Sequence, residues 1–117
     1  MSSKQGRRNR QRGAEFEREV CNAARAKGLD AERVQGRAGA ARLGDPDVII
    51  DGDITLECKR RKSLPGYLTD WLDGVDAAVI REDRGKAVVV MSLDKWLCWV
   101  KWARRDDVKD VDATEVG

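Results

Sequence analysis

A β-hairpin is the feature of this sequence that most constrains its fold. Three β-branched residues at 48–50 are followed by Asp51-Gly52-Asp53 and then by a segment in which apolar and polar residues alternate. Asp-Gly pairs favour the tight turns that join antiparallel strands, because both central residues of such turns adopt positive φ. From Ile54 to Lys59 the alternation predicts a strand with one apolar and one polar face. Residues 48–59 are therefore predicted to form two adjacent antiparallel strands.

The segments around the hairpin show helical and strand patterns in turn. Phe16, Val20 and neighbouring apolar residues predict a helix that begins near Gly13 and stops at Gly28. Further strands are predicted at 31–34, 77–80 and 87–91, the last of them buried, and helices at 65–72 and 93–103, with Ser92 able to cap the last helix. The order α-β-β-β-α-β-β-α indicates an α/β protein with helices packed on a sheet.

The tryptophans allow more than one interpretation. We expect Trp71 and Trp96 to pack in the core. Trp99 and Trp102 could also belong to the core, or to a dimer interface, where large aromatic side chains are enriched. Base stacking is the third alternative for these two residues.

Charge is distributed unevenly along the 117 residues, a length typical of one domain. Residues 1–12 carry five basic residues and no acidic one, whereas five of the residues from 106 to 117 are acidic. We therefore predict a basic flexible arm at 1–12, a single domain at 13–105 and an acidic, disordered tail at 106–117. A basic arm often marks a polyanionic partner, and a merely solvated tail is an equal alternative.

The cysteine and histidine content excludes several kinds of chemistry. The three cysteines form no CxxC pair, which argues against a disulfide framework and for a reducing, cytoplasmic environment. We see neither a signal-peptide pattern nor an apolar segment long enough for a membrane span. Because histidine is absent, catalysis by Ser-His-Asp or Cys-His and zinc sites built on imidazole are excluded. Hydrolysis by this chain would have to use carboxylates, lysine and a hard metal ion.

The residues with this chemistry lie on the two sides of the hairpin. Asp47 precedes the first strand, and Glu57 and Lys59 share one face of the second, so the three side chains can converge at one edge of the sheet. Two carboxylates can hold Mg²⁺ or Mn²⁺, and the backbone carbonyl of Cys58 can add an oxygen ligand. A lysine beside them can orient water or offset charge on a phosphate.

Charged residues also alternate on many solvent-facing strands, so the Glu-x-Lys pattern by itself is weak. Three features strengthen the interpretation as a phosphodiesterase site. Pro46 places Asp47 at the start of a strand, and the hairpin has the right length. The surrounding residues are basic, as a phosphate substrate requires: Arg37, Arg42, Arg60, Arg61 and Lys62.

Four motifs follow one another along the chain. Gly13-x-x-x-Glu17-Arg18-Glu19-Val20 lies on the predicted first helix, and Gly28 ends that helix before Arg33 on the first strand. Pro46-Asp47 and Leu56-Glu57-Cys58-Lys59 come next. In this order they resemble the motifs of the PD-(D/E)XK nucleases of the archaeal and phage Holliday-junction resolvase family, which include Pro-Asp and Ile-Glu-Val-Lys. The resemblance covers about residues 10–100.

This resemblance implies a restriction-endonuclease-like core, with a central mixed β-sheet of about five strands flanked by helices. It implies a homodimer that cleaves four-way DNA junctions with Mg²⁺, for which Mn²⁺ can substitute, in the cytoplasm of a host cell if the protein is of phage origin. It adds Glu17 to the catalytic set of Asp47, Glu57 and Lys59, and makes Glu17 a further candidate metal ligand. The expected DNA-binding residues are Arg7, Arg8, Arg10, Arg12, Arg33, Arg37, Arg42, Arg60, Arg61 and Lys62.

Three other functions remain open from the sequence. The same core could cleave flaps, duplexes, or restriction and repair substrates, since a fold does not fix a function. A junction-binding protein without catalysis is the second alternative. A structural α/β protein is the third.

Overall fold

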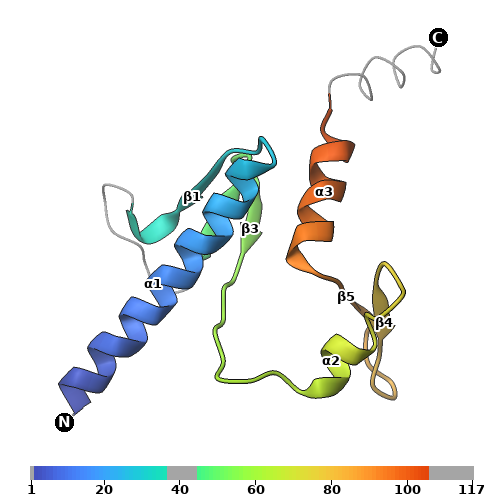
Figure 1. The fold of residues 1–117 in the computed structure, drawn as a ribbon, viewed down its shortest axis with the longest axis horizontal. Coiled ribbons are helices and arrows are strands. Elements are labelled where there is room, and N and C mark those ends of the chain that lie inside the picture. Colours follow the sequence, from blue (N-terminus) through green and yellow to red (C-terminus); the bar gives the residue numbers. More distant parts are fainter. Residues whose placement is uncertain (1, 37–44, 106–117) are drawn as a thin grey trace. The chain divides into compact units, whose positions relative to one another are not determined.

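The computed structural model describes residues 2–36 and 45–105, with side chains from residue 11 onward. The chain divides into two compact units, Met1–Arg61 and Lys62–Gly117 (Figure 1). The expected acidic tail lies outside the described residues. The expectation of a single domain stays a prediction.

The first unit contains the helix α1 (Ser2–Ala26), the strand β1 (Ala31–Arg33), a short 3₁₀ helix (Val34–Gly36), and the strands β2 (Val48–Ile50) and β3 (Ile54–Leu56). The helix begins well before Gly13, so the prediction that it starts near Gly13 is wrong. The separate basic arm at 1–12 stays a prediction. Arginine, lysine and glutamine are good helix formers, and they allow the helix to extend without an apolar face.

Gly28 ends α1 as the sequence predicts. Its φ of 83° is accessible at little cost to glycine. The N–H of Gly28 donates to the carbonyl of Arg25, and the N–H of Leu29 donates to the carbonyl of Ala24. These two bonds form a Schellman motif, which satisfies carbonyls at the helix end.

The predicted hairpin is confirmed. Asp51 and Gly52 have φ of 53° and 79°, and β2 pairs with β3 in antiparallel register, with Val48 opposite Leu56. β1 pairs with the other edge of β2, also antiparallel. β3 ends at Leu56, so the prediction that the strand continues to Lys59 is wrong. The Cys58 N–H donates to the Asp47 side chain rather than to a backbone carbonyl, which is one reason why regular pairing stops at this point.

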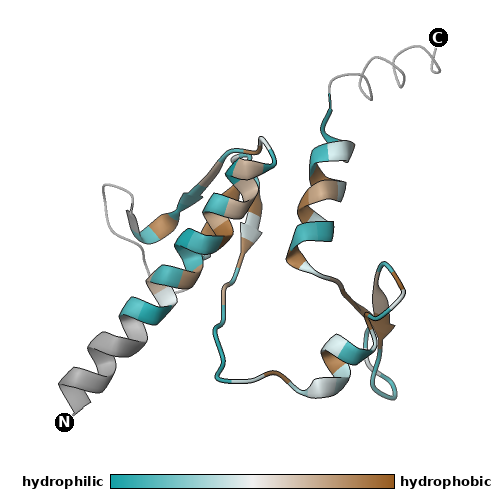
Figure 2. Cartoon of the chain, viewed as in Figure 1, coloured by the Kyte–Doolittle hydropathy of each residue, from teal (hydrophilic) through white to brown (hydrophobic). Residues whose placement is uncertain are grey.

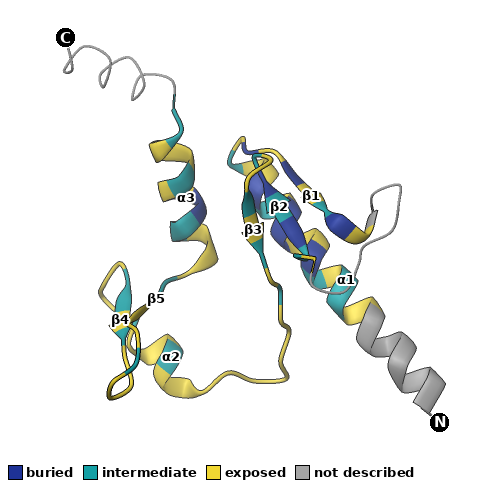
Figure 3. Cartoon of the chain, turned by 180° about the vertical axis from the view of Figure 1, so that it is seen from behind, coloured by how far each residue is buried: buried dark blue, intermediate teal, exposed yellow. Residues whose placement is uncertain are grey.

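The core of the first unit lies where α1 packs against β1 and β2 (Figure 3). Glu17, Val20, Cys21 and Ala24 are all buried, and their spacing of i, i+3, i+4 and i+7 places them on one face of the helix. The opposing strands contribute buried apolar side chains, namely Ala31, Val48 and Ile50. One acidic residue thus lies within an otherwise apolar stripe.

The second unit contains α2 (Gly66–Asp70), the hairpin of β4 (Ala78–Ile80) and β5 (Val88–Val90), and α3 (Leu93–Ala103). The Oγ of Ser92 accepts a hydrogen bond of 3.2 Å from the Lys95 N–H, which confirms the predicted cap. The Lys95 ammonium donates to Asp76 at 2.7 Å, and this bond raises the pKa of Lys95.

The hairpin of β4 and β5 is apolar (Figure 2), yet its side chains are largely exposed. Val79, Val88 and Val89 are 71%, 55% and 63% exposed, so the prediction that 87–91 is a buried strand is wrong. Trp71 is 51% exposed and contacts Tyr67, so it is not the core residue that we expected. A two-stranded sheet buries its faces only where another layer packs on them.

The protein is a mixed α/β protein, and the described elements follow the predicted order α-β-β-β-α-β-β-α. The described strands form one three-stranded and one two-stranded sheet, both antiparallel. Within the part of the chain that the structure describes, no helix combines the length and the apolar character needed to cross a membrane.

Candidate functional site

Asp47 is held in place by three hydrogen bonds at the end of the three-stranded sheet. Its N–H donates to the Leu56 carbonyl at 2.9 Å, and its carbonyl accepts from the Val34 N–H at 3.1 Å. Its carboxylate Oδ2 accepts from the Cys58 N–H at 2.7 Å. The short distance is typical of a bond to a charged acceptor. The side chain therefore lies against the backbone amide of Cys58, the residue whose carbonyl is the predicted additional ligand.

Glu57 and Lys59 follow β3 at the same end of the hairpin. Both side chains are exposed while Cys58 is half-buried, so the predicted alternation of faces continues past the end of the strand. The Lys59 ammonium lies 3.5 Å from Glu57 Oε2, with 72% and 58% of the two side chains exposed. An ion pair this open contributes little to stability, and both groups remain accessible to a ligand.

The Cys58 thiol reports on the charges around it. Burial raises the pKa of the Cys58 thiol to about 11, and the negative charges of Asp47, Glu17 and Glu57 add to the increase. Each of these carboxylates disfavours a further negative charge on the thiol.

Glu17 and Arg33 form an ion pair that connects α1 to the end of β1. The Arg33 Nε donates to Glu17 Oε1 at 3.0 Å, and only 21% and 12% of the Arg33 and Glu17 side chains are exposed. Sequence reasoning assigned Glu17 to catalysis and Arg33 to DNA but did not pair them. The position of Glu17 in the apolar stripe of α1 was the signal that could have distinguished it from Glu15.

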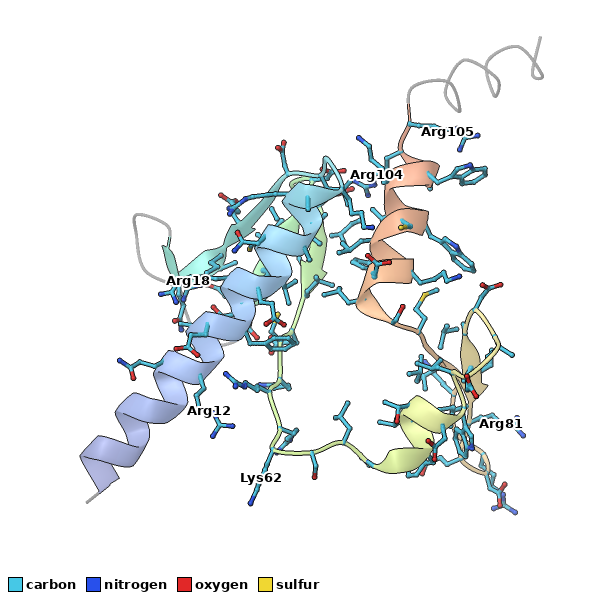
Figure 4. The ribbon with its side chains drawn as sticks, viewed as in Figure 1. Arg12, Arg18, Lys62, Arg81, Arg104 and Arg105 are labelled. Atoms are coloured by element: carbon cyan, nitrogen blue, oxygen red, sulfur yellow. The ribbon has the colours of Figure 1, made fainter. Side chains whose placement is uncertain are left out.

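The expected DNA-binding residues occupy several environments. Arg60 lies 3.5 Å from Glu15, with both side chains largely exposed. Arg12 is exposed, and Arg12 and Arg18 extend from different sides of α1 (Figure 4). Arg61 and Lys62 are exposed. The side chains of Arg7, Arg8 and Arg10, and the whole of Arg37 and Arg42, lie outside the described residues.

The donor set has the right chemistry for a hard cation, but the described side chains do not form a closed metal cage. Among the residues that the structure describes, no group of three or more acidic or cysteine side chains is arranged to hold a metal ion. Mg²⁺ commonly uses one or two carboxylates and retains several waters. Asp47 and Glu57, at one end of the hairpin, fit that smaller requirement.

Comparison with known proteins gives no assignment. No family model matches the chain, and neither the curated proteins nor the solved structures contain a significant match.

Proposed function

We propose that this protein is a metal-dependent DNA endonuclease with a restriction-endonuclease-like core, and that it cleaves four-way junctions. The observation that carries the proposal is the position of Asp47. Its carboxylate is bonded to the Cys58 N–H, between the two other residues of the Glu57-Cys58-Lys59 motif. The preference for junctions, and the finer assignment of the core, rest on the resemblance of the motifs.

Each residue of the site has a distinct role in this proposal. Asp47 and Glu57 would hold Mg²⁺ together with the Cys58 carbonyl. When bound, the ion lowers the pKa of a coordinated water and polarises the phosphate. The Lys59 ammonium orients the attacking water or offsets the negative charge that develops on the phosphate oxygens. Its present partner is Glu57, so metal binding at Glu57 would release the ammonium for this role.

The test of the site compares the wild type with Asp47→Asn and Glu57→Gln in Mg²⁺-dependent cleavage of a four-way junction. Each variant should lose about 100-fold or more of its cleavage rate, as enzymes do when a group acting in the transition state is removed. Glu15→Gln, which alters an exposed carboxylate of α1, is the matched control and should stay near the wild-type rate. Undiminished cleavage by either site variant would refute the assignment.

The substrate is tested separately from the chemistry. Cleavage rates on four-way, flap and linear duplex DNA at equal enzyme concentration distinguish a junction resolvase from other nucleases. Tight junction binding without cleavage in Mn²⁺ would instead support a binding protein.

DNA binding by the basic residues should depend on salt. Phosphate contacts release counterions, so a protein with several such contacts loses about 1000-fold in affinity between roughly 50 and 200 mM salt. An affinity that does not change over this range would contradict a phosphate-binding surface.

We also propose that the protein is a cytoplasmic homodimer. Sedimentation with and without DNA measures the oligomeric state directly.

A further inference from the structure

Glu17 is the charged residue that the described fold buries. Its exposed fraction is 9%, and it lies on the face of α1 that packs against the sheet. A carboxylate at such a position costs free energy unless it is paired and hydrogen-bonded. Arg33 supplies both the opposite charge and the hydrogen bond, over 3.0 Å. The two side chains therefore act as one unit.

The atoms that make this bond determine what the guanidinium can still do. Arg33 uses Nε. A guanidinium has five N–H donors, four of them on its terminal amino groups, and those terminal groups can bind the oxygens of a phosphate in a fork. Anchoring through Nε fixes the plane of the fork without using the terminal groups. The entropy cost of ordering a long side chain is then met before a ligand binds.

The location of the pair connects it to the candidate site. Arg33 is the last residue of β1, and the next residue, Val34, donates its N–H to the Asp47 carbonyl at 3.1 Å. Glu17 is also one of the charges that act on the Cys58 thiol, beside Asp47. Arg33 thus lies on the strand paired with β2, directly before the residue that is hydrogen-bonded to Asp47.

We propose that Glu17 is not a metal ligand but a positioning residue, which holds the Arg33 guanidinium so that Arg33 binds the phosphodiester that is cleaved. The inference rests on the proposed nuclease function and makes a different statement about Glu17 than direct catalysis or metal binding. A carboxylate oxygen already bonded to a guanidinium is a poorer ligand for a cation.

The central test measures two quantities for Glu17→Gln: the kinetic constants on junction DNA, and the Mg²⁺ concentration that gives half-maximal cleavage. A glutamine holds the guanidinium less firmly, so KM should rise or kcat fall by about tenfold. The half-saturating Mg²⁺ concentration should change by less than about twofold, whereas Asp47→Asn should raise it clearly. An increase in Glu17→Gln equal to that in Asp47→Asn would overturn the inference.

Arg33→Lys keeps the test decisive if other variants fold poorly. Lysine retains a positive charge beside Glu17 but cannot form a two-pronged contact with phosphate. The variant should therefore unfold at nearly the same denaturant concentration as the wild type, and its KM should still rise by about tenfold. A wild-type KM in folded Arg33→Lys would also overturn the inference.

Chemical rescue separates positioning from a structural role. Added guanidinium, at concentrations far below those that unfold proteins, should restore cleavage to Arg33→Ala by occupying the vacant place beside Glu17. It should restore much less to the double variant Glu17→Gln/Arg33→Ala, and equal rescue of both would contradict the anchor. Glu15→Gln/Arg33→Ala is the matched control and should be rescued like Arg33→Ala.

A wild-type protein that shows no metal-dependent cleavage would refute the proposed function itself. That outcome is distinct from a failure of the inference about Glu17.

Discussion

The hydrogen bond between Asp47 and the Cys58 N–H gives Asp47 a structural role that can be separated from its chemical one. In Asp47→Ala the N–H loses its acceptor, and in Asp47→Asn a neutral oxygen can still accept. Both variants lack the negative charge that a metal requires. The pair of variants therefore separates loss of stability from loss of charge.

The length and burial of this hydrogen bond set the expected loss of stability in the Asp47 variants. The bond is 2.7 Å long, part-buried and made to a charged acceptor. Hydrogen bonds to charged groups contribute about 1.5–3 kcal/mol, and partial exposure to water lowers the contribution of this bond to about 1–2 kcal/mol. Asp47→Ala should lower the free energy of unfolding by this amount, and Asp47→Asn by less than about half of it.

Urea unfolding measures the stability of each variant. The pH dependence of Cys58 alkylation measures the effect of the Asp47 charge on the thiol. Burial and then Asp47 raise the pKa of the Cys58 thiol to about 11, so alkylation of the wild type should increase about tenfold per pH unit from pH 8 to 10. Both variants remove a negative charge and should shift this profile to lower pH. Equal stabilities of the two variants, with an unchanged profile, would refute the role assigned to this bond.

Three further perturbations test other parts of the fold. Ile50→Ala removes a fully buried side chain and should cost about 2–5 kcal/mol, whereas Val89→Ala, at a 63% exposed position, should cost much less; chemical unfolding of both compares them. Gly28→Ala places a Cβ at a φ of 83° and should cost about 1 kcal/mol in the same assay. Because the raised pKa keeps the folded Cys58 protonated at pH values where the unfolded thiol ionises, stability should fall between about pH 9 and 11 relative to Cys58→Ala; pH-dependent unfolding that is identical in both proteins would contradict this.

Local elements were predictable because their signals are local. The Asp51-Gly52 turn requires positive φ, and Gly28 can end a helix in a conformation that few residues adopt. Ser92 can cap only a helix that starts next to it. Such features depend on a few neighbouring residues, and all three appear in the structure where the sequence places them.

Burial was less predictable because it depends on what packs against an element. The apolar residues of β4 and β5 have the pattern of a core strand, but they lie on a two-stranded hairpin with exposed faces. Trp71 is a large apolar residue of the kind found in cores, but about half of its surface is exposed. An apolar pattern indicates that burial would be favourable, but the residues are buried only if a second layer of structure packs against them.

The sequence by itself determined the order of the elements, the hairpin between Asp47 and Glu57, and the restriction of hydrolytic chemistry to carboxylates, lysine and metal. These follow from backbone preferences and from the absence of histidine. Only the tertiary structure decided that Glu17 is buried and paired with Arg33, and that Asp47 is bonded to the Cys58 N–H. These contacts join residues 16 and 11 positions apart, the first pair on α1 and β1 and the second pair just outside β2 and β3. The packing of α1 on the sheet and the pairing of β2 with β3 fix such distances, and no local preference encodes them.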